Sequence, residues 1–154
     1  MRLIRAGIED AYRLWNMQVE SFHGLYQRYQ DTETSPGAES IDKTILRLRQ
    51  PFTYYYFIQE KEVTVGAIRV VDKKDGDTPK RISPLFILPS YRNQGLAQKA
   101  IQAVEEIHGG FHWELETILQ EKGNCHLYEK MGYHQSEKKV PINDKMTLVF
   151  YQKD

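Results

Sequence analysis

The sequence predicts one mixed α/β domain, in which helices cover a central sheet. Three observations lead to this fold class. The chain has 154 residues, 40% of them apolar, which is enough for one packed core over residues 1–154 and leaves little room for a second. Several segments are rich in aromatic and β-branched residues, as strands are. After Pro89 the spacing of apolar residues changes from two to near 3.6, which indicates helix.

The first fifty residues predict a short strand at 3–5 and two helices. From Ser21 to Ser40 the apolar pattern fails, and glycines and a proline among polar residues favour a loop or a broken helix. A second helix is expected to begin at Ser40 and to stop at Pro51, with Ile41, Ile45 and Leu48 on one side. The expected buried face of the first helix consists of Ile8, Ala11, Tyr12, Trp15 and Val19.

Three strands are expected next, at 52–59, 63–71 and 81–88. A tight turn at 60–62 joins the first two as a hairpin. The polar segment 72–77 is expected to be an exposed turn.

The last third of the chain predicts a helix, a strand, a second helix and two more strands. The first helix carries an apolar face of Leu96, Ala100, Ala103, Val104 and Ile107 and ends at the two glycines 109–110. The strand at 112–119 is followed by a helix at 124–131, a strand after Gly132 and a final strand at 146–151. The predicted order is therefore β-α-α-β-β-β-α-β-α-β-β.

Charge and cysteine content limit the function classes. Twenty-one basic residues balance twenty-one acidic ones, which disfavours a nucleic-acid binder and gives no reason to expect a membrane partner. The single cysteine, Cys125, allows no internal disulfide, and no apolar run has the length of a signal peptide or a membrane span. We expect a cytoplasmic protein.

The segment from Phe86 to Ala97 combines an apolar strand, a polar turn and the start of an amphipathic helix. Unpaired backbone N–H groups at a helix N-terminus suit a phosphate, and Gly95 allows the backbone to approach it closely. Arg92 could add a charge-assisted contact. The spacing fits neither the P-loop nor the dinucleotide fingerprint.

Two blocks of this sequence resemble the GNAT acetyltransferase superfamily. Residues 92–97, read as R-N-Q-G-L-A, are similar to its R/Q-x-x-G-x-G/A signature, and residues 127–133, read as L-Y-E-K-M-G-Y, are similar to its later L/F-Y-x-x-x-G-F/Y block. The blocks stand in the right order, and the element order agrees over nearly the whole chain. The resemblance implies a mostly antiparallel mixed sheet with helices on both faces and acetyl-CoA as cofactor.

The resemblance also implies where the cofactor binds. Its phosphates would lie on the amides from Asn93 to Gln98, and its pantetheine arm would pair with the β-strand before this loop, where two parallel strands separate. Family members often contact the arm through an asparagine at the position of Glu121, so here either Asn124 replaces it or the contact is absent. The residues assigned to the cofactor are Phe86, Ile87, Arg92, Asn93, Gln94, Gly95, Leu96, Ala97, Gln98 and Asn124.

Two catalytic residues follow from the same resemblance. Tyr128 would be the general acid that protonates the departing thiolate, and Glu116 would be the base, acting through water. Glu114 lies on the same strand face and is the weaker candidate. Backbone N–H groups near Ile87 or Leu88 would hold the oxyanion.

The first two helices and the loop between them are expected to bind the acceptor, because aromatic and acidic side chains suit a cationic amine. The side chains considered are Glu20, Phe22, His23, Tyr26, Tyr29, Asp31, Glu33 and the strand 54–56. The predicted function is acetyl transfer to a primary amine of an unidentified small molecule or peptide. Two alternatives keep the enzyme but change the reaction: transfer of another acyl group, or transfer to a hydroxyl. A third is a non-catalytic module that binds coenzyme A or a protein partner. No metal is expected, and the last strands, near 146–151, could offer an edge for a homodimer.

Overall fold

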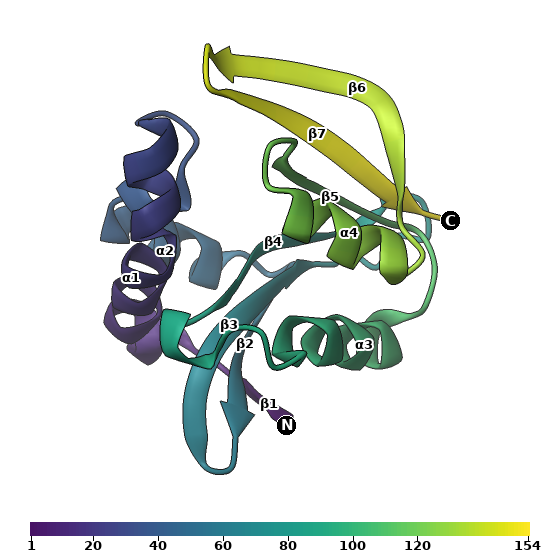
Figure 1. The fold of residues 1–154 in the computed structure, drawn as a ribbon. Coiled ribbons are helices and arrows are strands. Elements are labelled where there is room, and N and C mark those ends of the chain that lie inside the picture. Colours follow the sequence, from purple (N-terminus) through teal and green to yellow (C-terminus); the bar gives the residue numbers. More distant parts are fainter.

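A seven-stranded sheet forms the centre of the computed structural model, which describes residues 1–154 (Figure 1). The strands lie in the order β1-β2-β3-β4-β5-β7-β6, and every neighbouring pair is antiparallel except β4 and β5. The strands are β1 (Arg2–Arg5), β2 (Thr53–Glu60), β3 (Val63–Val71), β4 (Lys80–Ile87), β5 (Trp113–Ile118), β6 (His134–Asn143) and β7 (Met146–Lys153).

Four α-helices cover both faces of this sheet. In Figure 1, α1 and α2 lie together on one side, and α3 and α4 lie on the other. Their bounds are α1 (Ala11–Tyr29), α2 (Ile41–Arg49), α3 (Leu96–His108) and α4 (Lys122–Lys130), and short 3-10 helices lie at Ile8–Asp10, Pro36–Ala38 and Pro89–Tyr91. The predicted fold class, a mixed and mostly antiparallel sheet with helices on both faces, is confirmed.

Two apolar clusters hold these layers together, one on each face of the sheet. The larger cluster packs α3 and α4 against the sheet and includes Ile101 and Trp113, while the smaller one includes Leu14 of α1. Successive residues of a strand point to opposite faces, so Tyr56 belongs to the larger cluster and Tyr55 to the smaller.

The parallel pair β4 and β5 is joined at one end only. Its register contains Lys80↔Trp113 and Arg81↔Glu114, and no residue of β4 beyond Arg81 pairs with β5. β5 pairs instead with β7 along its whole length. The sheet therefore opens between β4 and β5 toward their carboxyl ends.

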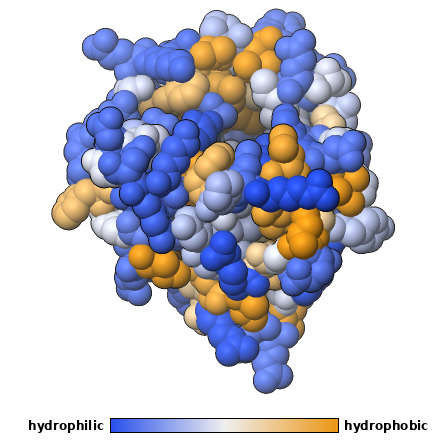
Figure 2. Space-filling model, turned by 180° about the vertical axis from the view of Figure 1, so that it is seen from behind, coloured by the Kyte–Doolittle hydropathy of each residue, from blue (hydrophilic) through white to orange (hydrophobic).

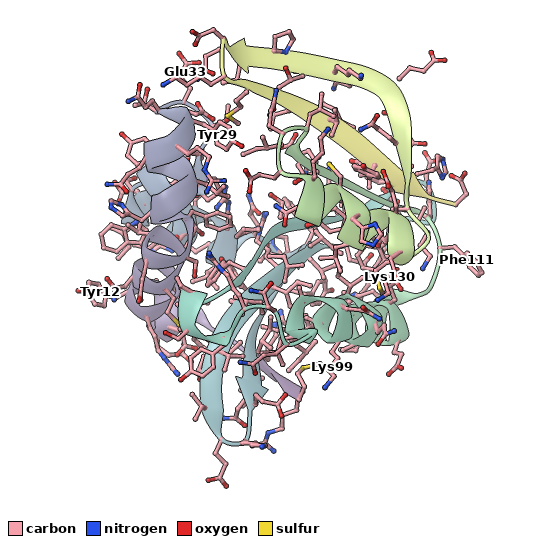
Figure 3. All side chains as sticks on the ribbon, in the orientation of Figure 1. Tyr12, Tyr29, Glu33, Lys99, Phe111 and Lys130 are labelled. Atoms are coloured by element: carbon pink, nitrogen blue, oxygen red, sulfur yellow. The ribbon has the colours of Figure 1, made fainter.

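Helix α1 differs from the sequence prediction in its length and its buried face. It continues through Gly24 to Tyr29, because the segment that breaks the apolar pattern still turns side chains inward. Gln18 and Ser21 are polar but buried, whereas Ile8 and Tyr12 are exposed (Figure 3 labels Tyr12 on the outside). The expected face is correct at Ala11, which is buried, and wrong at Ile8 and Tyr12, because apolar spacing alone does not reveal buried polar side chains.

Two further expectations are corrected in part. Residues 73–77 are exposed as expected, but Asp72 is buried, and its carboxylate accepts a hydrogen bond from Nδ1 of His108 at 2.8 Å. The final strand offers no free edge, since β7 lies between β5 and β6 and the edge strand is β6. No helix of the structure has both the length and the apolar character that a membrane crossing requires.

The smaller cluster allows a test of the core. Leu14 has no exposed surface, and Leu46 of α2 is 61% exposed. Leu14→Ala should reduce the free energy of unfolding by about 2–5 kcal/mol, because it removes apolar contacts and leaves a cavity. Leu46→Ala, the same change in an exposed helical position, should stay within about 0.5 kcal/mol of the parent. Urea unfolding measures both, and equal losses would contradict the assigned orientation of α1.

Candidate functional site

The loop between β4 and α3 presents a row of unpaired backbone N–H groups. Within the protein, none of the backbone N–H groups from Asn93 to Gln98 donates a hydrogen bond. The chain turns through left-handed conformations at Asn93, with φ 64°, and at Gly95, with φ 74°. A Cβ at Gly95 would meet no atom within 4 Å, so the space in front of it is open. The loop therefore has the form of an anion-binding site.

The side chain of Arg92 does not point freely at this site. Its Nε donates to the carbonyl of Ile87 at 3.0 Å, and a second guanidinium nitrogen donates to the carbonyl of Ser21 at 2.6 Å. These two bonds fix the loop to β4 and α1. The side chain of Arg92 thus has a positioning role that the sequence did not indicate, and its remaining N–H groups are left for the expected phosphate contact.

The end of β4 leaves one backbone donor facing the opening in the sheet. The N–H of Leu88 donates to the carbonyl of Val65 at 2.8 Å, so it is not available to an oxyanion. Successive N–H groups along a strand point to opposite edges, and that of Ile87 therefore points away from β3, toward β5. Of the two expected oxyanion donors, only Ile87 remains.

A cleft of about 450 Å³ lies on the α1–α2 side of this opening. Its floor comes from β3, β4 and β5, and its walls come from α1, the loop at 31–36, α2, α4 and β7. Figure 2, seen from behind, shows a hollow near the top of the molecule with apolar side chains in its wall. Glu116, Asn124 and Tyr128 all line the cleft.

Tyr128 reaches the cleft from α4. The ring is half-buried and packs against the rings of Tyr133 and Tyr151, with centroids 6.2 and 6.0 Å away. Its hydroxyl has no hydrogen-bond partner within 3.5 Å in the chain. Burial raises the pKa of Tyr128 to about 12, so the phenol carries its proton at neutral pH. The side chain is therefore a fixed phenol with a free hydroxyl.

The two candidate bases of β5 both face Arg81. A carboxylate oxygen of Glu116 lies 3.1 Å from the guanidinium of Arg81, whereas that of Glu114 lies 3.8 Å away. Only Glu116 lines the cleft. The structure thus distinguishes two residues that the sequence placed on one strand face.

Glu121 has a role that the sequence did not indicate. Its carboxylate accepts hydrogen bonds from Arg28, at 2.7 Å, and from the hydroxyl of Tyr29, at 2.5 Å. The side-chain amide of Asn143, in the β6–β7 hairpin, donates to the carbonyl of Tyr29 at 2.9 Å. Figure 3 shows Tyr29 at the end of α1 that lies nearest this hairpin. These bonds join α1, α4 and the hairpin across the cleft, and we call them the α1 bridge.

Only some of the expected acceptor residues lie at the cleft. Lining the cleft are Phe22, Tyr29, Asp31 and Glu33. Tyr54 and Tyr56 line a different hollow on the α3 side, and Tyr55 is buried. The other candidates, Glu20, His23 and Tyr26, are not part of the cleft. The sequence analysis missed three arginines of the cleft, Arg47, Arg69 and Arg81, because single basic residues on strands and helices carry no pattern.

Known proteins resemble this chain in sequence pattern and in fold. A model of the "Acetyltransferase (GNAT) family" matches residues 11–133. No curated protein matches. Several solved structures have the same fold at low sequence identity.

Three of these structures illustrate the likeness. A spermidine N-acetyltransferase from Vibrio cholerae, in complex with CoA and spermine, has a TM-score of 0.74 at 14% identity, covering 97% of this chain and 92% of that one. The PaiA N-acetyltransferase from Thermoplasma acidophilum, in complex with coenzyme A, has a TM-score of 0.72 at 14% identity and covers 99% and 98%. The ribosomal-protein-S18-alanine N-acetyltransferase from Escherichia coli has a TM-score of 0.72 at 12% identity and covers 97% and 90%.

The state of Tyr128 can be measured directly. The protein is labelled with 13C at the Cζ atoms of its tyrosines, and the NMR resonance of Tyr128 is identified as the one that is missing in Tyr128→Phe. This resonance should titrate with a midpoint near pH 12, against about 10 for free tyrosine. The pKa of Tyr128 is higher in the folded state than in the unfolded state. The contribution of Tyr128 to the free energy of unfolding is therefore fully present below pH ~10 and is lost as the pH rises toward 12. A midpoint at or below 10 would contradict the buried setting of this ring.

Proposed function

Because the chain belongs to the GNAT acetyltransferase family, we propose that it transfers an acetyl group from acetyl-CoA to a primary amine. The observation that carries this proposal is that two features border the opening between β4 and β5, one in the loop that follows β4 and the other in the cleft beside the opening. One is the row of unpaired N–H groups from Asn93 to Gln98, and the other is the free hydroxyl of Tyr128 at the cleft. The first suits phosphates, and the second suits a leaving group that needs a proton.

The residues present fit acetyl-CoA. The amides of the loop and the open space at Gly95 would hold its phosphates, as helix N-termini do. The unpaired edge of β4, including Phe86 and Ile87, would hold the amides of the pantetheine arm. Asn124 lines the cleft, as Tyr128 does, and its side chain could contact the arm, whereas Glu121 is engaged by Arg28 and Tyr29.

When bound, acetyl-CoA supplies an activated acyl group: the amine nitrogen bonds to the acetyl carbon, the C–S bond breaks, the sulfur takes a proton and the nitrogen gives one up. Tyr128 donates the proton to the sulfur. An ordinary phenol and an ordinary thiol have pKa values within about 2 units, and the apolar surroundings that raise the pKa of Tyr128 raise that of a buried thiol as well.

Two further groups complete the site. The N–H of Ile87 stabilises negative charge on the carbonyl oxygen, because it points into the opening and has no partner there. Glu116 accepts the proton of the amine, directly or through water, and Arg81 holds its carboxylate in place at 3.1 Å.

Binding of the cofactor to this loop can be tested with two glycine variants. Calorimetric titration with acetyl-CoA should show micromolar binding to the parent, weakened at least tenfold, or by about 1.4 kcal/mol, in Gly95→Asp. The added Cβ is strained at this φ, and the carboxylate repels phosphate.

Gly76→Asp is the matched control for this titration. Gly76 has φ 75°, also faces open space and lies outside the loop. The Gly76→Asp variant has the same backbone strain and the same added charge, but it should bind acetyl-CoA as tightly as the parent does. A parent protein that does not bind acetyl-CoA would overturn the proposed function.

The role of Tyr128 predicts a selective loss of turnover. Tyr128→Phe should lower kcat by about 10²–10⁴-fold and leave the affinity for acetyl-CoA unchanged, since the phenol acts on the leaving sulfur. Tyr12→Phe, at a position that is 65% exposed and outside the cleft, should keep the parent's kcat. Release of free thiol measures turnover. Equal rates in Tyr128→Phe and the parent would remove Tyr128 as the acid.

A further inference from the structure

Arg69 is a buried cation in the floor of the cleft with no carboxylate partner. It stands on β3, is 7% exposed and lines the cleft. Its guanidinium donates three hydrogen bonds, all to neutral oxygens. The acceptors are the hydroxyl of Thr53 at 3.2 Å, the carbonyl of Ser83 at 2.7 Å and the side-chain carbonyl of Gln50 at 2.9 Å. A guanidinium has further N–H groups that these bonds leave free.

The two neighbouring arginines of the cleft are paired with carboxylates, and Arg69 differs from them in having no such partner. Arg47 binds Glu39 through two bonds of 2.8 and 3.0 Å, and Arg81 binds Glu116 at 3.1 Å. Within the cleft these pairs use two carboxylates, and a third, Glu114, lies outside the cleft at 3.8 Å from Arg81, so none of the three is paired with Arg69.

The remaining acids of the cleft make no ion pair with Arg69. The carboxylate of Asp31 accepts hydrogen bonds from its own loop, at Glu33 and Thr34. Glu33 itself is exposed, and Figure 3 shows it at the outer end of α1. Of the four basic side chains that line the cleft, Arg69 is therefore the one without an ion pair.

Such a charge is unfavourable without an anion. Burying an ion without a counter-charge typically costs several kcal/mol. Burial, together with the positive charges of Arg47 and Arg81, lowers the pKa of Arg69 to about 10, although the negative charge of Glu39 acts in the opposite direction. The group is still protonated at neutral pH. An anionic ligand would relieve this repulsion.

We propose that the amine acetylated in this cleft also carries an anionic oxygen group, a carboxylate or a phosphate, which Arg69 and Arg81 bind. This rests on the proposed acetyl transfer. Guanidiniums suit such groups because their N–H groups match two oxygens at once. Arg69, Arg81 and Glu116 belong to three neighbouring strands, so the anionic group lies toward β3 and the amine toward β5 and Tyr128.

The rival explanation is that Arg69 is only a structural clamp. It bonds the carbonyl of Ser83 where the register of β3 and β4 shifts between Ile68 and Val70. A clamp would affect every acceptor alike. Binding of an anionic group would affect only acceptors that carry one, and mainly through KM.

The experiment compares matched amines with acetyl-CoA, with thiol release as the readout. The pairs are β-alanine with propylamine, 4-aminobutyrate with butylamine, and O-phosphoethanolamine with ethanolamine, so that the carboxylate and phosphate arms are separate. In each effective pair the anionic member should have at least a tenfold higher kcat/KM. Arg69→Gln should remove this preference by raising KM for the anionic member. It should leave kcat/KM unchanged for the member that lacks the anionic group, and Arg69→Lys should restore part of the preference.

Arg49→Gln is the control, because Arg49 is exposed, lies on α2 and is outside the cleft. It should keep the preference. Circular dichroism and thermal unfolding show whether Arg69→Gln folds, and Arg81→Gln provides a second variant that should also reduce the preference. An equal loss for all amines in Arg69→Gln would show a clamp and overturn the assignment.

Two other outcomes separate this inference from the proposed function. One outcome is that acetyl-CoA binds and that amines without an anionic group, or spermidine, are acetylated better than the amines that carry one. Acetyl transfer would then stand and the inference would be overturned. If no amine of the panel reacts, glutarate is titrated into the CoA-saturated protein. A rise in Tm that Arg69→Gln abolishes would support the anion site, and no rise in the parent would overturn it.

Discussion

The site depends on the early end of pairing between β4 and β5. After Arg81 and Glu114 the two parallel strands share no register, although both continue. Full pairing would cover the N–H of Ile87 and close the floor of the cleft. Because the strands part, the backbone edge of β4, the phenol of Tyr128 and the carboxylate of Glu116 reach one space. β5 can part from β4 without losing its own partner, because β7 pairs with it throughout.

The two faces of the sheet carry different features around this opening. The α3 side carries the larger apolar cluster and the loop with unpaired N–H groups, and the α1–α2 side carries the charged cleft. Arg92 links the two, since its guanidinium bonds both the end of β4 and the carbonyl of Ser21 in α1. A residue that the signature motif associates with the cofactor thus also holds the wall of the acceptor side.

Local patterns in the sequence were sufficient for the class of fold and for the conformation of the loop between β4 and α3. A strand, a glycine with positive φ and an amphipathic helix are adjacent in the chain, so residues 86–98 could be predicted without tertiary information. The buried face of α1 could not, because Gln18 is buried through bonds to Pro36 and Glu39, far along the chain. The arginines of the cleft were missed for the same reason: their meaning depends on which carboxylates lie beside them.

The α1 bridge gives the cleft a mechanical property. Glu121 precedes the first turn of α4, the helix that carries Tyr128, and it holds Arg28 and Tyr29 at the end of α1. Asn143 ties the same end to the β6–β7 hairpin. An outward displacement of the end of α1 would therefore break these bonds or move α4 with it. As long as the bonds hold, the width of the cleft and the position of the helix that carries Tyr128 are coupled.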